Sequence, residues 1–381
     1  MKNTFGSAVS MTIFGESHGP AIGAVLDGLA AGLPVDPDFL AVRMDRRRAR
    51  GDGLSTARTE PDEIEFLSGV LDGHTTGTPV TMLLRNTNTR SKDYAATAAL
   101  LRPGHADYTA YAKYEGFQDA RGGGHFSGRL TAAAVAAGAL CESVLQSLGV
   151  RVYTHIASCA GVDDAPLSSA AGLVLPEPAP GHFALLDPGK EIPMQEAIRA
   201  AGAEGDSVGG ILETVVTGLP AGIGEPWFDS VESMLAHLLF AIPAVKGVEF
   251  GAGFGFAKLR GSTANDAFRM QGDRVVTATN RNGGVNGGIT NGMPVVFRTA
   301  VKPTPSIYKQ QDTVDYAARA DAALQIQGRH DPCIVPRAAV VQNSLAAFGL
   351  LDLLTQRYGT LAQRHGPVSY THMTLPTNSR V

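Results

Sequence analysis

The chain has 381 residues, of which 44% are hydrophobic and 18% are charged, and its formal net charge at neutral pH is −4. This composition is typical of a globular protein with enough residues to bury a large core, which excludes a disordered or fibrous chain. Because the chain is slightly acidic, it lacks the excess of basic residues that binds nucleic acid, so we do not expect nucleic acid as a partner.

Short runs of apolar residues predict strands, and the first of them lies close to the N-terminus. Val9, Met11 and Ile13 alternate with polar residues, as in a strand with one buried face. A helix is predicted next, with Asp36 as its N-cap and Pro37 as its first residue, and it ends in a cluster of arginines. Further strands are predicted over residues 80–84, 211–217 and 294–301.

The longest predicted helix runs from Gly128 to about Leu148 and carries an alanine-rich apolar stripe. Two further helices are predicted near 230–241 and 342–357. Strands and helices interleave without a regular βαβ repeat, which favours a mixed α/β or α+β architecture. No Pro/Ser-rich or charged linker divides the chain, so we predict one large domain.

Three cysteines, Cys141, Cys159 and Cys333, are odd in number and far apart. Neither a disulfide framework nor a CxxC metal or redox site is therefore expected, and no metal is predicted. The sequence contains no run of about 18–20 continuous apolar residues, the length that spans a bilayer. We therefore predict no association with a membrane and a cytoplasmic location.

Glycine accounts for 45 residues and forms two dense clusters, at 122–124 and at 283–288. The first cluster directly precedes the predicted alanine-rich helix, with Arg121 and Arg129 on either side of it. Backbone N–H groups at a helix start, together with arginine side chains, favour a phosphate at this point. A pair of tight turns is the alternative interpretation of the same glycines.

Positive charge is concentrated at the end of the first predicted helix, where five arginines fall within eight residues. A solvated helix end is one explanation, since cations are favourable near the C-terminal pole of a helix dipole. A site for a ligand with phosphate and carboxylate groups is the other, and the glycine clusters favour it. In this cluster we expect Arg47 to face the ligand and Arg43, one turn earlier, to be solvated. The five arginines are Arg43, Arg46, Arg47, Arg48 and Arg50.

Two histidines lie in short polar contexts, His18 within residues 15–19 and His105 within residues 102–107. An imidazole transfers protons near neutral pH, although a histidine in a loop also serves as a structural hydrogen-bonding group. A further polar group spans 329–333 and is preceded by the turn-forming segment 302–306. The alternative interpretation is that these residues only form turns and loops and have no role in a site.

In their order along the chain, these motifs resemble those of the chorismate synthase family. The similarity runs from about Gly6 to the predicted helix near residue 357. The segments that carry it are Gly15-Glu16-Ser17-His18-Gly19, Asp45-Arg46-Arg47-Arg48, Arg102-Pro103-Gly104-His105-Ala106-Asp107, Lys302-Pro303-Thr304-Pro305-Ser306 and Gly328-Arg329-His330-Asp331-Pro332-Cys333.

The resemblance implies a β-α-β sandwich in a single domain over residues 1–366, assembled as a homotetramer. It implies a lyase that converts 5-enolpyruvylshikimate 3-phosphate to chorismate and phosphate by a 1,4-elimination that requires reduced FMN. This is the last step of the shikimate pathway toward the aromatic amino acids. NADPH or an external flavin reductase is the implied source of electrons, and the sequence does not decide between them.

The resemblance also assigns roles to individual residues. His18 is similar to the histidine that assists phosphate departure, and His105 to the one that protonates or stabilises reduced flavin. Ser17 and Asp331 resemble the polar pair that helps to remove the proton that reaches flavin N5. The implied groups for substrate or NADP are Arg47, Arg48, Arg102 and Arg129. The implied flavin-binding residues are His125, Phe126, Ser127, Gly287, Lys302, Pro303, Thr304, Pro305, Ser306 and Arg329.

The sequence departs from the common family pattern in four places. Residues 125–127 are His-Phe-Ser where Arg-Ser-Ser is usual, and Pro243 replaces an asparagine. An arginine is missing near Gly53, with Arg50 or Arg58 as its substitute. The segment 367–381 matches nothing in the family and is interpreted as a non-native or disordered tail.

Two other classes of function are alternatives to the lyase. A nucleotide-dependent oxidoreductase or kinase would use glycine-rich loops and arginines, but the chain has no GxxxxGK[ST] loop, and 251–255 lacks a third glycine at the required spacing. A non-enzymatic phosphate-binding module would not need two loop histidines together with Ser17 and Asp331. Bound flavin would discriminate among these classes.

Overall fold

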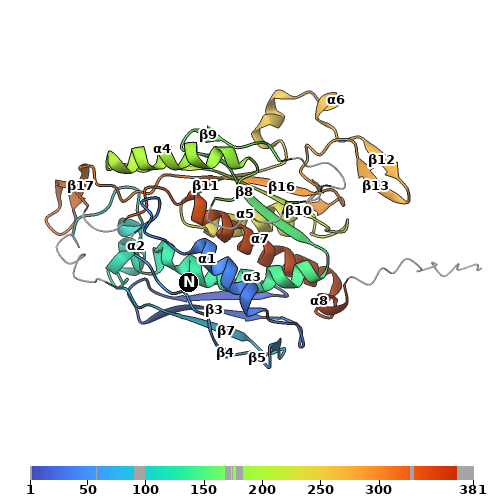
Figure 1. Cartoon of the computed structure of the whole chain (residues 1–381), viewed down its shortest axis with the longest axis horizontal. Coiled ribbons are helices and arrows are strands. Elements are labelled where there is room, and N and C mark those ends of the chain that lie inside the picture. The colour runs from blue at the N-terminus through green and yellow to red at the C-terminus, as the bar shows by residue number, and fades with distance from the viewer. Residues whose placement is uncertain are drawn as a thin grey trace, which may run out of the picture.

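The computed structural model describes residues 2–56, 58–89, 99–167, 173, 175–176, 183–326 and 330–366. A layer of helices lies between two five-stranded sheets, which gives a β-α-β sandwich (Figure 1). The predicted mixed architecture is therefore confirmed. The predicted non-native or disordered tail, 367–381, lies outside the described residues.

The first sheet, in the lower part of Figure 1, turns one apolar face toward the helices. Ile22, Ala24 and Leu26 are fully buried and recur with the period of two that a strand imposes. Helix α3 (Thr131–Ser147) packs against strands β3 (Ala21–Asp27) and β7 (Val80–Arg85) of this sheet. The antiparallel order is β1-β2-β3-β7-β4, with bounds Thr4–Gly6, Ser10–Gly15, Ala21–Asp27, Val80–Arg85 and Glu65–Ser68.

The second sheet packs on the helical layer through α7 (Val335–Tyr358), which contacts β8 and β10. Its central strands bury Leu212 and Phe297 completely. The strands predicted over 211–217 and 294–301 are confirmed as β10 and β16. The strand predicted over 80–84 is confirmed as β7. The antiparallel order is β11-β16-β10-β8-β9, with bounds Val245–Phe250, Val295–Val301, Gly210–Thr217, Arg151–Cys159 and Val162–Asp163.

Helices α3 (Thr131–Ser147) and α7 (Val335–Tyr358) cross the centre of the molecule in contact with each other. Gly138 permits this contact, because a Cβ there would lie 2.3 Å from the backbone oxygen of Ser344 on α7. The alanine-rich sequence of α3 thus brings two helix backbones close together.

Helix α7 begins seven residues earlier than the 342–357 that we predicted. Pro336 is the second residue of the helix, where the missing N–H costs no hydrogen bond. Helices Gly128–Ser147 and Val335–Tyr358 are long and apolar enough to cross a membrane, but 78% and 100% of their most apolar windows are buried inside the fold. Both have the burial of core helices.

Helix α1 (Pro37–Arg47) begins where the sequence predicts. The Asp36 side chain accepts hydrogen bonds from the backbone N–H groups of Asp38, at 3.0 Å, and Phe39, at 3.1 Å. Such a cap satisfies N–H groups that have no partner inside the helix.

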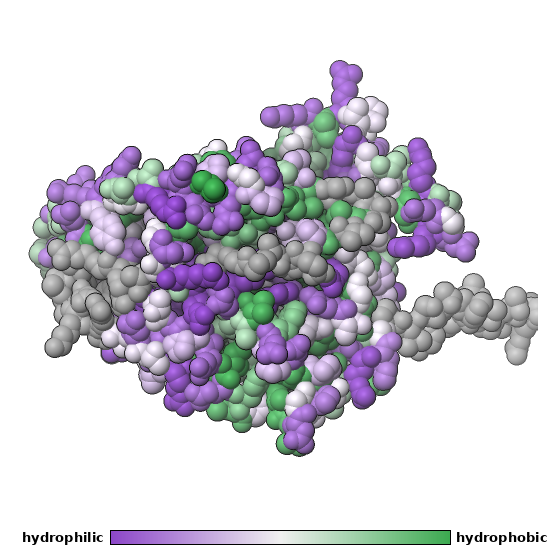
Figure 2. Space-filling view, viewed as in Figure 1, coloured by the Kyte–Doolittle hydropathy of each residue, from purple (hydrophilic) through white to green (hydrophobic). Residues whose placement is uncertain are grey.

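The remaining elements are short and lie around this sandwich. On the face shown in Figure 2, hydrophilic residues predominate, with hydrophobic patches over the region of α1 and the first sheet. The hairpin of β12 and β13 projects at the upper right of Figure 1, beside α6. The other helices are α2 (Asp107–Tyr114), α4 (Glu191–Ala203), α5 (Val231–Ala241), α6 (Gly261–Ala264) and α8 (Ala362–His365). The small hairpins are β5 (Val70–Leu71) with β6 (His74–Thr75), β12 (Phe268–Gln271) with β13 (Arg274–Thr277), β14 (Val285–Asn286) with β15 (Ile289–Thr290), and β17 (Gln311–Asp315) with β18 (Ala320–Leu324).

Arg43 is buried, so our prediction that it is solvated is wrong. Its Nε and one terminal nitrogen donate to the two carboxylate oxygens of Glu142 on α3, at 2.9 and 2.8 Å. Its guanidinium also lies 4.3 Å from the centre of the Phe39 ring. The pair joins α1 to α3, a packing contact that the helical period of α1 does not reveal.

We expect Arg43→Ala to lower the free energy of unfolding by about 3 kcal/mol, because it leaves the Glu142 carboxylate buried without its cation. Denaturant unfolding measures the change. The matched control is Arg50→Ala, since Arg50 forms an exposed pair with Asp45 at 2.7 Å and should contribute at most about 1 kcal/mol. Equal losses in the two variants would show that burial of the Arg43 pair is unimportant.

Candidate active site

A cavity of about 880 Å³ opens at the end of the helical layer where α1 ends and α3 and α7 begin. This volume is at the upper end of the range for small-molecule sites. Among the described residues that line it, nine are lysine or arginine and three are aspartate or glutamate, an excess of six positive charges. In a chain with a net charge of −4, this excess favours an anionic ligand.

Part of the cavity wall is apolar. Phe5, Phe240 and Phe348 line it, and the ring of His237 lies edge-on to Phe5 with their centroids 4.6 Å apart. Aromatic walls with a few polar groups are typical of sites for flat organic ligands. The cavity therefore combines a surface for a ring system with charges for anionic groups.

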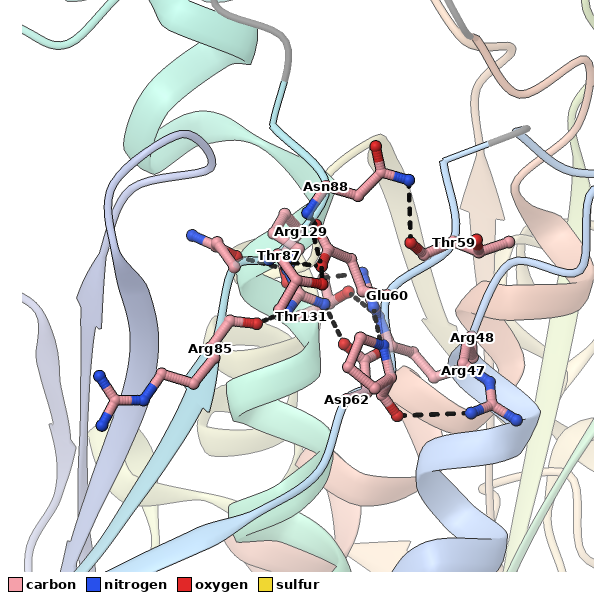
Figure 3. Close-up of polar contacts among 12 residues, drawn as sticks. Arg47, Arg48, Thr59, Glu60, Asp62, Arg85, Thr87, Asn88, Arg129 and Thr131 are labelled. Carbon is pink, nitrogen blue, oxygen red and sulfur yellow. Dashed lines mark hydrogen bonds and ion pairs between the residues drawn. The ribbon is translucent and has the colours of Figure 1, made fainter.

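Asp62 joins two of the predicted arginines (Figure 3). One carboxylate oxygen accepts from Arg47 at 3.0 Å and the other accepts from Arg129. The three residues are only 4–6% exposed. Burial lowers the pKa of Arg47 to about 9, against the opposing effect of Asp62, so the guanidinium stays protonated at neutral pH.

Arg47 makes further contacts with the start of α3. Its Nε donates to Thr131 at 3.1 Å, and a terminal nitrogen donates to the backbone oxygen of Gly128 at 3.0 Å. We predicted that Arg47 leaves the helix end toward the ligand. The structure instead fixes most of its donors within the protein, so that it contributes mainly a rigid positive charge to the cavity wall.

Of the two candidate substitutes for the missing arginine, Arg58 lines the cavity and Arg50 does not. The terminal nitrogens of Arg58 donate to the Ser17 hydroxyl at 2.8 Å and to the Ser17 carbonyl at 3.0 Å. They also bind Glu60, whose carboxylate accepts from the N–H and hydroxyl of Thr87 (Figure 3). Burial by itself would raise the pKa of Glu60, but hydrogen bonds from Thr87 and Arg58 outweigh it and lower the pKa.

The triple glycine accommodates two imidazoles. A Cβ on Gly122 would lie 2.0 Å from Cε1 and 2.2 Å from Nδ1 of His18, and a Cβ on Gly123 would lie 3.3 Å from Nε2 of His105. We predicted an anion cradle with Arg121 beside it. Arg121 instead forms an exposed pair with Asp119 at 2.8 Å and does not line the cavity. Gly122 is needed because a side chain there would displace His18, whereas a Cβ on Gly123 would require His105 to move only a few tenths of an ångström.

The loop before α2 is closed by the carboxylate of Asp107. It accepts from Nε and a terminal nitrogen of Arg102, at 2.8 and 2.7 Å, and lies 2.8 Å from Nδ1 of His105. Burial would raise the pKa of Asp107, but hydrogen bonds from Arg102 and His105 outweigh it and hold the pKa well below its usual range. Asp107 belongs to the 102–107 motif, but we predicted no role for it.

Asp331 is held by two donors at the start of α7. Its carboxylate accepts from the backbone N–H of Thr56 at 2.9 Å and from Arg337 at 2.7 Å. Asp331 and Ser17 both line the cavity, and the residues that bind them, Thr56 and Arg58, are two positions apart. Sequence reasoning missed Arg337, Glu60 and Asp62, because single charged residues outside a motif carry no signal.

Most of the predicted flavin-binding residues line the same cavity. Pro303 does not line it, and Gly287 occupies the turn between β14 and β15, also outside the lining. Arg329 lies outside the described residues. Among the departures from the family pattern, Pro243 lines the cavity, and Nδ1 of His125 is 2.8 Å from the backbone oxygen of Gly15. The predicted residues that do line it are His125, Phe126, Ser127, Lys302, Thr304, Pro305 and Ser306, together with Arg48 and Arg102.

Known proteins share both the sequence and the fold. The chorismate synthase family model matches residues 9–355. A chorismate synthase of Dehalococcoides mccartyi is 44% identical over 361 residues, which cover 93% of this chain and 96% of that protein. One of Methanosarcina mazei is 46% identical over 350 residues, covering 92% and 95%. A crystal structure of chorismate synthase superposes with a TM-score of 0.72 at 28% identity, covering 93% of this chain and 94% of the other. The chain therefore belongs to the chorismate synthase family.

Proposed function

We propose that this protein catalyses the 1,4-elimination of phosphate from 5-enolpyruvylshikimate 3-phosphate, which forms chorismate, and that the reaction requires reduced FMN. The single observation that carries the proposal is the convergence of His18, His105, Ser17 and Asp331 on one cavity with an excess of positive charge. The substrate carries a phosphate and two carboxylates, which suit that charge.

The donor set of the cavity fits a flavin mononucleotide. Phe126 provides an aromatic surface, and Lys302, Thr304 and Ser306 provide donors for a phosphate. These residues, together with His125 and Ser127, would hold the flavin. When bound, reduced FMN supplies an electron-rich ring system to the reaction.

The departing phosphate needs positive charge or a proton. Arg47 and Arg129 are fixed by Asp62 before any ligand binds, so they stabilise negative charge without reorganising. His18, which lines the same cavity, is the group suited to protonate the departing oxygen. The imidazole of His105 would support negative charge on a flavin held in the cavity.

Ser17 and Asp331 are proposed to remove the proton that is lost from the substrate. The Ser17 hydroxyl oxygen accepts from Arg58, which leaves the hydroxyl proton to be donated elsewhere. The carboxylate of Asp331 accepts hydrogen bonds from Thr56 and Arg337, which hold it in place, and it is proposed as the final acceptor of the proton.

An anaerobic assay tests this function. With catalytic amounts of chemically reduced FMN, we expect the enolpyruvyl phosphate to be converted to chorismate and phosphate without net consumption of reductant. A parallel reaction with oxidised FMN and NADPH shows whether the chain reduces its own flavin, and oxidised FMN alone is the control. Oxidation of one flavin per turnover would rule out a redox-neutral elimination.

A further inference from the structure

We infer that Asp107 is a positioning residue that fixes the tautomer of His105, so that proton exchange with a ligand takes place at Nε2. The inference rests on the proposed function for the part that His105 plays in the reaction. The tautomer itself is a property of the protein without ligands and is tested separately below.

The loop that carries both residues is held by one carboxylate. Asp107 is the first residue of α2, and its oxygens accept from the backbone N–H of Arg102 at 3.0 Å as well as from the Arg102 side chain. The backbone N–H of His105 donates to the Arg102 carbonyl at 3.1 Å. Asp107 therefore sets the position of the loop from which the His105 ring extends.

The contact between the two side chains decides which ring nitrogen is protonated. Nδ1 of His105 lies 2.8 Å from Oδ1 of Asp107, and an ionised carboxylate has only acceptors, so Nδ1 carries the hydrogen. A terminal nitrogen of Arg102 also lies 3.1 Å from Nδ1. This Arg102 nitrogen is closer to Oδ1 of Asp107, at 2.7 Å, and donates its hydrogen bond there. The neutral ring is thus the Nδ1–H form.

The other edge of the ring faces the triple glycine. A Cβ built on Gly123 would lie 3.2 Å from Cε1 and 3.3 Å from Nε2 of His105, next to the glycine against which His18 packs. Both histidines line the cavity. Nε2 accepts a proton when the ring is neutral and donates one when the ring is charged. The nearby charges are Arg102, Asp107 and Lys302, whose ammonium donates to the Gly104 carbonyl at 2.6 Å.

A purely structural role for Asp107 makes a different prediction. In that case the carboxylate would hold only Arg102 and the loop, and its removal would lower stability without changing the tautomer. Asp107→Asn separates the two roles, because asparagine has nearly the same shape. Its amide can present either an oxygen or an N–H to Nδ1, so it no longer dictates which ring nitrogen is protonated.

The experiment uses the full chain labelled with ¹⁵N-histidine, without flavin or substrate, at a pH where the imidazole is neutral. His105→Gln identifies the His105 signals. The control, Glu65→Gln, also removes a carboxylate from an arginine pair, the exposed one with Arg85 at 2.8 Å. Ring ¹⁵N shifts should show Nδ1–H in the unmodified chain and in the control, and a gain of the Nε2–H form in Asp107→Asn.

Turnover provides the second readout. In the anaerobic assay we expect Asp107→Asn to lower kcat by about 10- to 100-fold, the range seen when a histidine that binds a metal loses the group that orients it. The KM of this variant should stay within about threefold of that of the unmodified chain. Glu65→Gln should leave kcat and KM unchanged. An Nε2–H tautomer in the unmodified chain would overturn the inference even if the variant fails to fold. Full kcat in a folded Asp107→Asn would overturn it as well. If the unmodified chain shows Nδ1–H and makes no chorismate, the proposed function fails and the tautomer assignment stands.

Discussion

Asp62→Asn is expected to lower the free energy of unfolding by about 5 kcal/mol, at the upper end of the range for breaking a buried ion pair. The Asp62 carboxylate is 4% exposed and is shared by Arg47 and Arg129. Its loss leaves both buried guanidinium groups without the carboxylate that pairs with them. Asparagine is the appropriate replacement because Asp62 has φ +54°, a left-handed conformation that asparagine tolerates.

The control for Asp62→Asn is Asp72→Asn. Asp72 also has a positive φ, +48°, but lies exposed in the turn between β5 and β6. We expect its replacement to change stability by less than about 0.5 kcal/mol. Denaturant unfolding of both variants measures the difference. If the two variants are equally stable, the shared carboxylate does not stabilise the two arginines.

Gly122→Ala is expected to lower turnover by about 100- to 1000-fold, as much as His18→Ala, within the range for loss of a general acid or base. The added Cβ would overlap two atoms of the His18 ring, at 2.0 and 2.2 Å, so the imidazole must leave its position. Substrate binding should be largely retained, because Arg47 and Arg129 are held separately by Asp62.

Gly73→Ala is the control for the effect of backbone conformation. Gly73 has φ +73°, close to the +60° of Gly122, and a Cβ there meets nothing within 4 Å. Its replacement should cost about 1 kcal/mol of stability and leave turnover unchanged. Anaerobic turnover and substrate titration of both variants provide the comparison. Equal turnover in Gly122→Ala and Gly73→Ala would mean that the glycine does not position His18.

Local signals in the sequence predicted local structure well. Asp36 and Pro37 mark the start of α1, and period-two alternation marks the first strands, because capping and strand periodicity depend on residues only a few positions apart. The start of α7 was missed for the opposite reason. That helix is buried on nearly all sides, so it has no polar face to reveal its period.

The sequence by itself determined the family, the mixed fold and the motif residues, since Ser17, His18, His105 and Asp331 carry a recognisable order along the chain. Only the tertiary structure decided which charges are buried and what each one binds. Arg43 and its partner Glu142 are 99 positions apart, and Asp62 and Arg129 are 67 apart. Such pairs depend on which helices and loops pack together. A residue's own neighbours in sequence do not contain that information, because burial and ion pairing arise from contacts between distant segments.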